Sequence, residues 1–183
     1  MRKTLLVLGV LFLTVSMSHA EAPKFGVGGF GGINIPIVQD DQKSGTVFGL
    51  KGRLVVTSFL VAEPHVSFGK WGDPDPIDGV NLEIAGSKIT SFGIDATLGG
   101  MPGKKGLKPF AFVGFASYKV KNDDTAYDES KLGIAGGFGF LIGVSPLLDI
   151  DIRGKAVIAP QEEGSKKAVW ILGGLNYYFG GGY

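Results

Sequence analysis

The sequence predicts an all-β fold, an eight-stranded antiparallel up-and-down transmembrane β-barrel. Eight runs of about 10 to 12 residues alternate apolar with small or polar side chains, as tilted membrane-crossing strands do. The connections alternate too: those after the first, third, fifth and seventh runs are longer and polar, and two of the other three are tight. In order, the expected strands are Phe25–Ile35, Thr46–Thr57, from the turn near Ser58 to about Trp71, about Lys88–Leu98, Pro109–Lys121, Lys131–Val144, Leu147–Ile158 and Ala168–Phe179.

Residues 1–20 are predicted to be a secretory signal peptide, and residues 21–183 a single barrel domain. Arg2 and Lys3 form a basic start, an apolar run follows, and a small-x-small site ends at Ala20. We therefore expect cleavage after Ala20.

Composition limits the class of protein. Without Arg2 and Lys3, the mature chain has 16 basic and 17 acidic residues, a balance that argues against nucleic-acid binding. There is no cysteine, so stability must come from hydrogen bonds and packing. No mature stretch approaches 18 apolar residues, yet mean hydropathy is positive, a combination typical of membrane barrels.

The first run contains Gly26-x-Gly28-x-x-Gly31, which matches a dinucleotide-binding fingerprint by its letters. That fingerprint needs a strand before it and a helix after it, whereas the cleavage site precedes these glycines and Ile-Asn-Ile-Pro follows them. We interpret the glycines as close-packing positions in a narrow barrel, and no cofactor is expected.

The second and third runs form a hairpin. If its turn is centred on Ser58, Arg53 lies opposite Glu63 on the same face, a favourable cross-strand pair. Pro64 lacks a backbone donor, so we expect a bulge or a local break at this position.

The connections carry most of the loop charge. Gly72–Ser87 is rich in Asp and Pro and includes a strand-like piece, Val80–Ile84, while Asn122–Ser130 is acidic. The basic turn Gly99–Lys108 is longer than the pattern of tight turns predicts. The fifth run has bulky residues on both faces, which leaves its orientation open.

The sixth run sets large apolar residues against glycine and alanine, and the seventh alternates most sharply. In the seventh run, one face is Leu148, Ile150, Ile152, Ala156 and Ile158, and the other is Asp149, Asp151, Arg153 and Lys155.

The eighth run ends in a Tyr/Phe cluster, Tyr177-Tyr178-Phe179, on a strand with one apolar face. In this ending the chain resembles the small eight-stranded outer-membrane barrels, the family of the OmpA membrane domain, OmpX and the opacity-type proteins. The resemblance implies porin-like architecture and recognition of the C-terminal strand by the barrel-assembly machinery. Gly180–Tyr183 extend beyond the aromatic residue expected to be last.

Periodicity alone allows the apolar face to point either to lipid or into a lipocalin-like core. Lipid is favoured because mid-strand charges share one face, which is also the small, glycine-rich one, and because aromatics gather near strand ends. An eight-stranded barrel is just wide enough for side chains to fill it, so the inward charges are expected to pair with one another. The predicted lumenal network is Lys51, Arg53, Glu63, Asp95, Asp149, Asp151, Arg153 and Lys155.

Two other functions stay open. Glu63, His65 and Ser67 share one strand face and could belong to a lipid-modifying enzyme, although residues two apart on a strand point in parallel, which suits a proton relay poorly. The second open function is that of a small passive channel. No enzyme activity and no metal site are predicted: Asp73, Asp75 and Asp78 lack the register of an EF-hand loop, and with the acidic loop they are interpreted as solvated charge.

We therefore expect a monomeric outer-membrane barrel of a Gram-negative-type bacterium. Its partners would be the lipid bilayer and lipopolysaccharide, and its role structural or surface interaction through the external loops. The loop ligand cannot be identified from the sequence.

Overall fold

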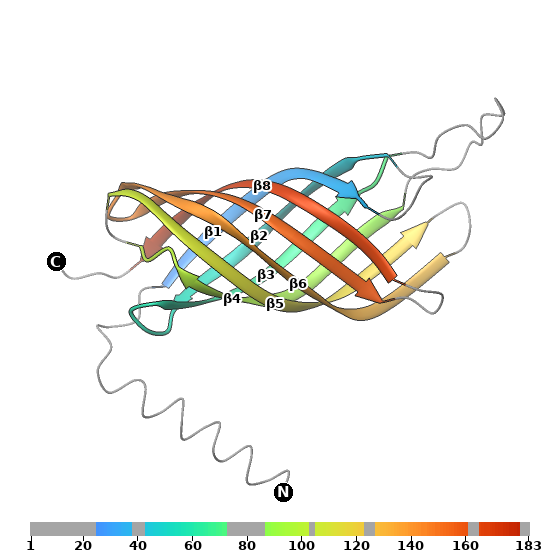
Figure 1. Cartoon of the computed structure of the whole chain (residues 1–183), viewed down its shortest axis with the longest axis horizontal. Helices are drawn as coiled ribbons and strands as arrows, with labels where there is room; N and C mark the ends of the chain where they lie inside the picture. The colour runs from blue at the N-terminus through green and yellow to red at the C-terminus, as the bar shows by residue number, and fades with distance from the viewer. Residues whose placement is uncertain are drawn as a thin grey trace, which may run out of the picture.

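The computed structural model is a closed barrel of eight antiparallel strands (Figure 1). It describes residues 25–37, 43–72, 87–102, 105–122, 127–160 and 165–179. Each strand pairs with the next in sequence, and β1 pairs with β8, so the predicted fold class is confirmed. The strands are β1 (Phe25–Pro36), β2 (Gly45–Val55), β3 (Leu60–Lys70), β4 (Lys88–Gly99), β5 (Gly106–Asn122), β6 (Tyr127–Ser145), β7 (Leu148–Pro160) and β8 (Ser165–Phe179).

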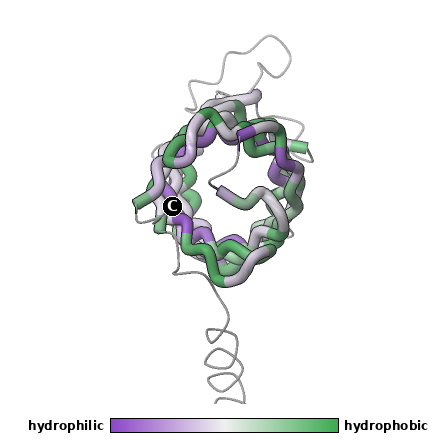
Figure 2. Tube along the Cα trace, turned by 90° about the vertical axis from the view of Figure 1, so that its left-hand side faces the viewer, coloured by the Kyte–Doolittle hydropathy of each residue, from purple (hydrophilic) through white to green (hydrophobic). Residues whose placement is uncertain are grey.

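Barrel closure places the first and last strands side by side. Phe25 at the start of β1 pairs with Phe179 at the end of β8, and their rings stack with centroids 6.1 Å apart. Viewed along the long axis of the barrel, the chain trace forms a closed ring (Figure 2). The start of β1 and the end of β8 therefore lie at the end of the barrel that carries the short connections. We name it the periplasmic end after the expected orientation, in which short turns face the periplasm.

The hairpin of β5 and β6 is longer than the sequence predicts. The pairing continues to Asn122↔Tyr127, so Tyr127–Ser130 belong to β6 instead of the expected acidic loop, and Gly106–Lys108 belong to β5 instead of the basic turn. Apolar alternation fades where a strand leaves the membrane, so a polar extension of a strand resembles a loop in sequence.

Pro64 produces a local break without a bulge. The β2–β3 register runs to Lys51↔His65 and resumes unshifted at Leu54↔Ala62. The side chain of Pro64 faces outward, and β3 stays in register with β4 through Pro64↔Ile94. A register shift occurs instead in β6, between Gly143 and Ser145.

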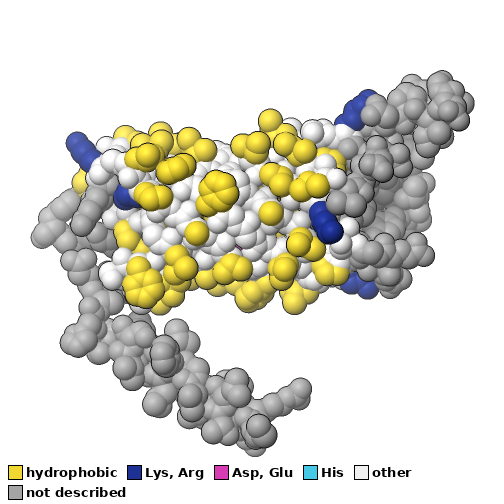
Figure 3. Space-filling model, in the orientation of Figure 1, with side chains coloured by type: hydrophobic (Ala, Val, Ile, Leu, Met, Phe, Trp, Pro, Cys, Tyr) yellow, Lys and Arg dark blue, Asp and Glu magenta, His cyan; other side chains and the backbone are white. Residues whose placement is uncertain are grey.

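The apolar rows face outward. Ile152 is 49% exposed whereas its neighbour Asp151 is 1% exposed, which is the lipid-facing arrangement and not that of a soluble barrel. Hydrophobic side chains cover the side of the barrel in Figure 3, and the visible Lys and Arg side chains lie toward its two ends. A membrane-spanning helix is absent from the described residues.

Several predictions concern residues outside the described ranges. These are the signal peptide 1–20, the strand-like piece Val80–Ile84, the carboxylates Asp73, Asp75 and Asp78, and the overrun Gly180–Tyr183.

Glycine is required on β6 but not at the neighbouring position of β7. A Cβ added to Gly137 would overlap the carbonyl oxygen of Gly154, whereas a Cβ added to Gly154 meets nothing within 4 Å. We expect Gly137→Ala to lower the free energy of unfolding by about 1–3 kcal/mol, because the backbones must separate. The matched control Gly154→Ala should leave it unchanged or raise it by up to about 1 kcal/mol. Urea titration of both refolded variants measures this, and equal midpoints would contradict it.

Candidate functional site

The interior of the barrel is charged across its middle. All eight residues of the predicted network point inward and are buried, and they come from β2, β3, β4 and β7. Alternation explains this placement, because the charges occupy one parity of strands whose other parity faces lipid.

Arg153 is the centre of the network. Its Nη1 donates to Glu63 Oε2 at 2.8 Å and its Nε donates to Asp151 Oδ1 at 2.9 Å, with a further bond from Nη2 to Asp151. Glu63 also forms an ion pair with Arg53, whose Nε lies 2.8 Å from Glu63 Oε1; this is the residue that the hairpin register predicts opposite it. Two guanidinium groups thus hold one carboxylate, an arrangement suited to the forked donors of arginine.

Two lysines complete the middle of the lumen. Lys51 Nζ lies 2.6 Å from Asp151 Oδ2, and Lys155 Nζ lies 2.8 Å from Asp95 Oδ2. His65 lies beside the second pair, with Nε2 3.5 Å from Lys155 Nζ and Nδ1 3.7 Å from Asp95 Oδ2. Each described cation here therefore faces a carboxylate, as buried charges require.

Asp149 is the one predicted network residue that pairs outside this group. It lies near the periplasmic end, where its Oδ1 is 3.7 Å from Lys108 Nζ. The sequence pattern assigns Lys108 to a turn, and only the extension of β5 brings it to the barrel. Arg53 reaches the same end, where it donates to the hydroxyl of Tyr178.

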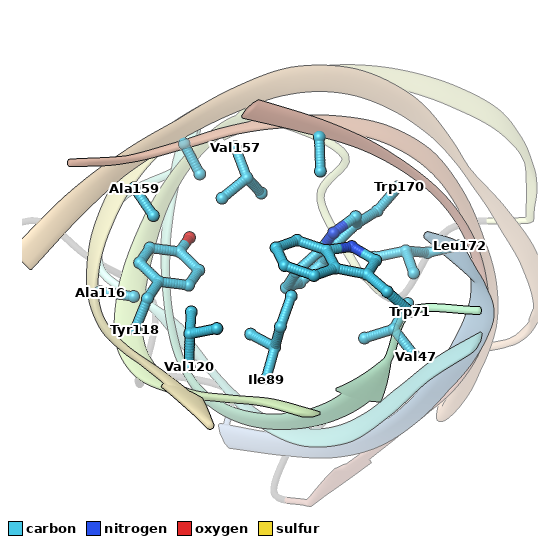
Figure 4. Close-up of a cluster of buried hydrophobic side chains, with 12 residues drawn as sticks. Val47, Trp71, Ile89, Ala116, Tyr118, Val120, Val157, Ala159, Trp170 and Leu172 are labelled. Carbon is cyan, nitrogen blue, oxygen red and sulfur yellow. The ribbon is translucent and has the colours of Figure 1, made fainter. Parts of the chain in front are cut away.

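An apolar plug fills the opposite half of the lumen. Trp71, Tyr118, Val157 and Trp170 project from the wall into the interior (Figure 4). The tryptophan and tyrosine rings of Trp170 and Tyr118 meet edge to face, with centroids 6.5 Å apart. The remaining members of this plug are Val47, Ile89, Ala116, Val120, Ala135, Ala159, Ala168 and Leu172.

Strand β5 supplies interior aromatics that sequence reasoning missed. Phe110, Phe112 and Tyr118 face inward, and the Arg153 guanidinium carbon lies 5.0 Å and 5.2 Å from the centroids of the two phenylalanine rings. Lys155 Nζ lies 5.9 Å from the Trp170 ring. These contacts place cations against ring faces as well as carboxylates. The only signal in the sequence was that both faces of the fifth run are bulky.

Little open space remains at the junction of network and plug. The cavity there has a volume of about 10 Å³, room for about one water molecule. It is lined by Phe30, Lys51, Glu63, His65, Asp95, Arg153, Lys155, Trp170 and Leu172.

The contacts of Glu63, His65 and Ser67 do not form a relay. Ser67 Oγ is hydrogen bonded to Ser91 Oγ at 2.6 Å, while His65 Nδ1 lies 3.3 Å from the backbone oxygen of Glu63. The Glu63 carboxylate is held by arginines. Nucleophile, base and acid therefore have separate partners in the described structure. Among the described residues, no group of three or more His, Cys, Asp or Glu is placed to hold a metal ion.

A known family shares this architecture. Residues 4–179 match the family model for the outer membrane protein beta-barrel domain. No curated protein matches the chain.

Several solved structures share the fold. Neisserial surface protein A (NspA) is similar with a TM-score of 0.68 and 14% identity, covering 87% of this chain and 100% of its own. OprG from Pseudomonas aeruginosa has a TM-score of 0.58 and 13% identity, and the match covers 88% of this chain and 98% of OprG. Ail, the attachment invasion locus protein of Yersinia pestis, has a TM-score of 0.53 and 15% identity, and the match covers 87% of this chain and 99% of Ail. At these identities the likeness concerns the fold alone.

Proposed function

The chain belongs to the outer membrane protein beta-barrel family, and on this basis we propose that it is a closed scaffold that presents its external loops for surface contacts. As a member it is an integral barrel of the Gram-negative outer membrane, surrounded by lipid and lipopolysaccharide. The finer role rests on the lumen, where buried ion pairs and an apolar plug occupy the cross-section.

The filled lumen favours a scaffold over a passive channel. Ions crossing an eight-stranded barrel would have to displace side chains that are paired with one another. A lumen of this kind adds rigidity to the wall, so the chemical variation available to the protein lies in its connections. One structural relative is named Neisserial surface protein A, and another is named the attachment invasion locus protein of Yersinia pestis.

Export and assembly belong to the same proposal. Residues 1–20 would be removed after Ala20, and residues 21–183 would form the inserted domain. Tyr177 and Phe179 face outward at the end of β8, where Tyr177 lies edge to face with Phe179 at 5.0 Å between centroids. An exposed aromatic pair at a strand end is a suitable contact for the barrel-assembly machinery.

The orientation of the loops can be tested by epitope tagging. We expect a tag inserted between Asp78 and Gly79 to bind antibody on intact cells, because the connection of β3 and β4 would face outward. A tag after Gly100, in the connection of β4 and β5, is the matched control and should bind only after permeabilisation. Both proteins should migrate faster on gels when unheated, as a folded barrel does. The reverse pattern of labelling would refute the proposed display, and altered lipid A mass spectra on expression would favour the enzyme reading instead.

A further inference from the structure

Three lysines stand beside one another on the outer surface of the barrel. Lys70 of β3 is the register partner of Lys88 of β4, which is the partner of Lys121 of β5. All three are exposed, as is Lys119 two residues further along the same face. Like charges directly opposite on a sheet are destabilising, so a bound anion would relieve a repulsion built into this row.

The lysine row, Lys70, Lys88 and Lys121, lies at a defined height on the barrel. Lys70 ends β3 and Lys88 begins β4, so the row is at the end with the longer connections, which faces outward in this family. Toward the periplasmic end the same surface carries Phe68, Phe92 and Phe115, which are 44%, 71% and 57% exposed. The lysine row therefore lies at the edge of the apolar belt, which is the level of the lipid headgroups.

The row is a run of basic residues across three neighbouring strands, because Lys70, Lys88 and Lys121 are consecutive register partners. Each lysine also interacts with another group of the chain. A ligand for the row would thus be an anion strong enough to add to or replace these contacts, and phosphate is the anion that lysine ammonium groups bind as point charges.

We infer that the lysine row binds the phosphate groups on the headgroup of the outer-leaflet glycolipid, lipid A. The inference rests on the proposed function, since it requires the longer connections to face outward. Acyl chains of the same lipid would lie along the phenylalanine belt below, so one molecule could satisfy the charged and the apolar parts of the surface together. Lys167 of β8 is also exposed and outward, but its register partner is Ile158, so it provides a lysine outside the row for comparison.

The test uses the purified, refolded mature chain in neutral detergent micelles, with lipid A as the probe. Binding of diphosphorylated lipid A is compared with that of lipid A of the same acylation lacking both phosphates. We expect Lys70→Gln/Lys88→Gln to weaken binding of the diphosphorylated form about thirty-fold. The matched control Lys105→Gln/Lys167→Gln removes the same charge from positions outside the row and should stay within about twofold of the wild type.

The outcomes separate the inference from the proposed function. Equal affinity of wild type and Lys70→Gln/Lys88→Gln for diphosphorylated lipid A would overturn the inference, as would equal binding of the dephosphorylated lipid. Competition by inorganic phosphate at the affinity of lipid A would also overturn it, because the site would then recognise the free anion. Faster gel migration of every unheated variant establishes folding. Failure of the lipid A binding experiment would leave the epitope-tagging result unaffected, and with it the proposed display of the external loops.

Discussion

Arg153→Ala should lower the free energy of unfolding of the barrel by about 3–5 kcal/mol, the loss expected when one partner of a buried ion pair is removed. Arg153 is 6% exposed and bonds to Glu63 and Asp151, so its removal leaves part of two buried carboxylates without a donor. It also removes a cation that lies over the rings of Phe110 and Phe112. Denaturant titration of the refolded protein measures the loss.

Two control variants isolate the cause. Lys105→Ala removes an exposed positive charge and should change the free energy of unfolding by no more than about 0.5 kcal/mol. Arg153→Lys keeps the charge but loses the fork that reaches both carboxylates, so it should fall between wild type and Arg153→Ala.

The same variant tests whether the network closes the lumen. The wild type should show no stepwise conductance in planar bilayers, because the cavity beside Arg153 holds only about one water molecule. Arg153→Ala enlarges that cavity and should admit ions. An unchanged unfolding midpoint together with zero conductance would show that the paired lumen is not what stabilises and seals the barrel.

Lys155→Met should also lower the free energy of unfolding by about 3–5 kcal/mol, because it breaks the buried ion pair of Lys155 with Asp95. Its Nζ lies 3.1 Å and 2.8 Å from the two carboxylate oxygens of Asp95, which is 3% exposed and would be left buried without its cation. Methionine keeps most of the side-chain volume but removes the cation that lies 5.8 Å and 5.9 Å from the centroids of the Phe112 and Trp170 rings. The expected loss is therefore one of charge compensation and not of packing.

The double variant Lys155→Met/Asp95→Leu supplies the decisive comparison. Removing both charges of a buried pair is often neutral or stabilising, so the double variant should recover most of the stability lost by Lys155→Met. The wild type and both variants are unfolded in the same buffer and at the same pH. If the double variant were as unstable as Lys155→Met, packing around Lys155 would account for the loss instead of the ion pair.

The sequence alone determined which side of the wall the side chains of the clearly alternating strands face. Alternation is a local property of the chain, and a shift by one residue would exchange every lipid-facing and lumenal side chain. Alternation placed Asp151 and Arg153 on one face and Arg53 opposite Glu63 across the hairpin, and the charged, glycine-rich character of that face indicated that it points inward.

Only the tertiary structure decided the partners across the lumen. Arg153 and Glu63 are 90 residues apart, and their meeting depends on how the sheet closes, which no local pattern records. Barrel closure also places Phe110 and Phe112 of the fifth run in the interior, where they face Arg153. It brings Lys108 close to Asp149. Trp71 and Trp170, which are far apart in the sequence, both become part of the plug. Periodicity assigns a side chain to a face, but the stagger between eight strands sets its height in the barrel, and height decides which charges meet.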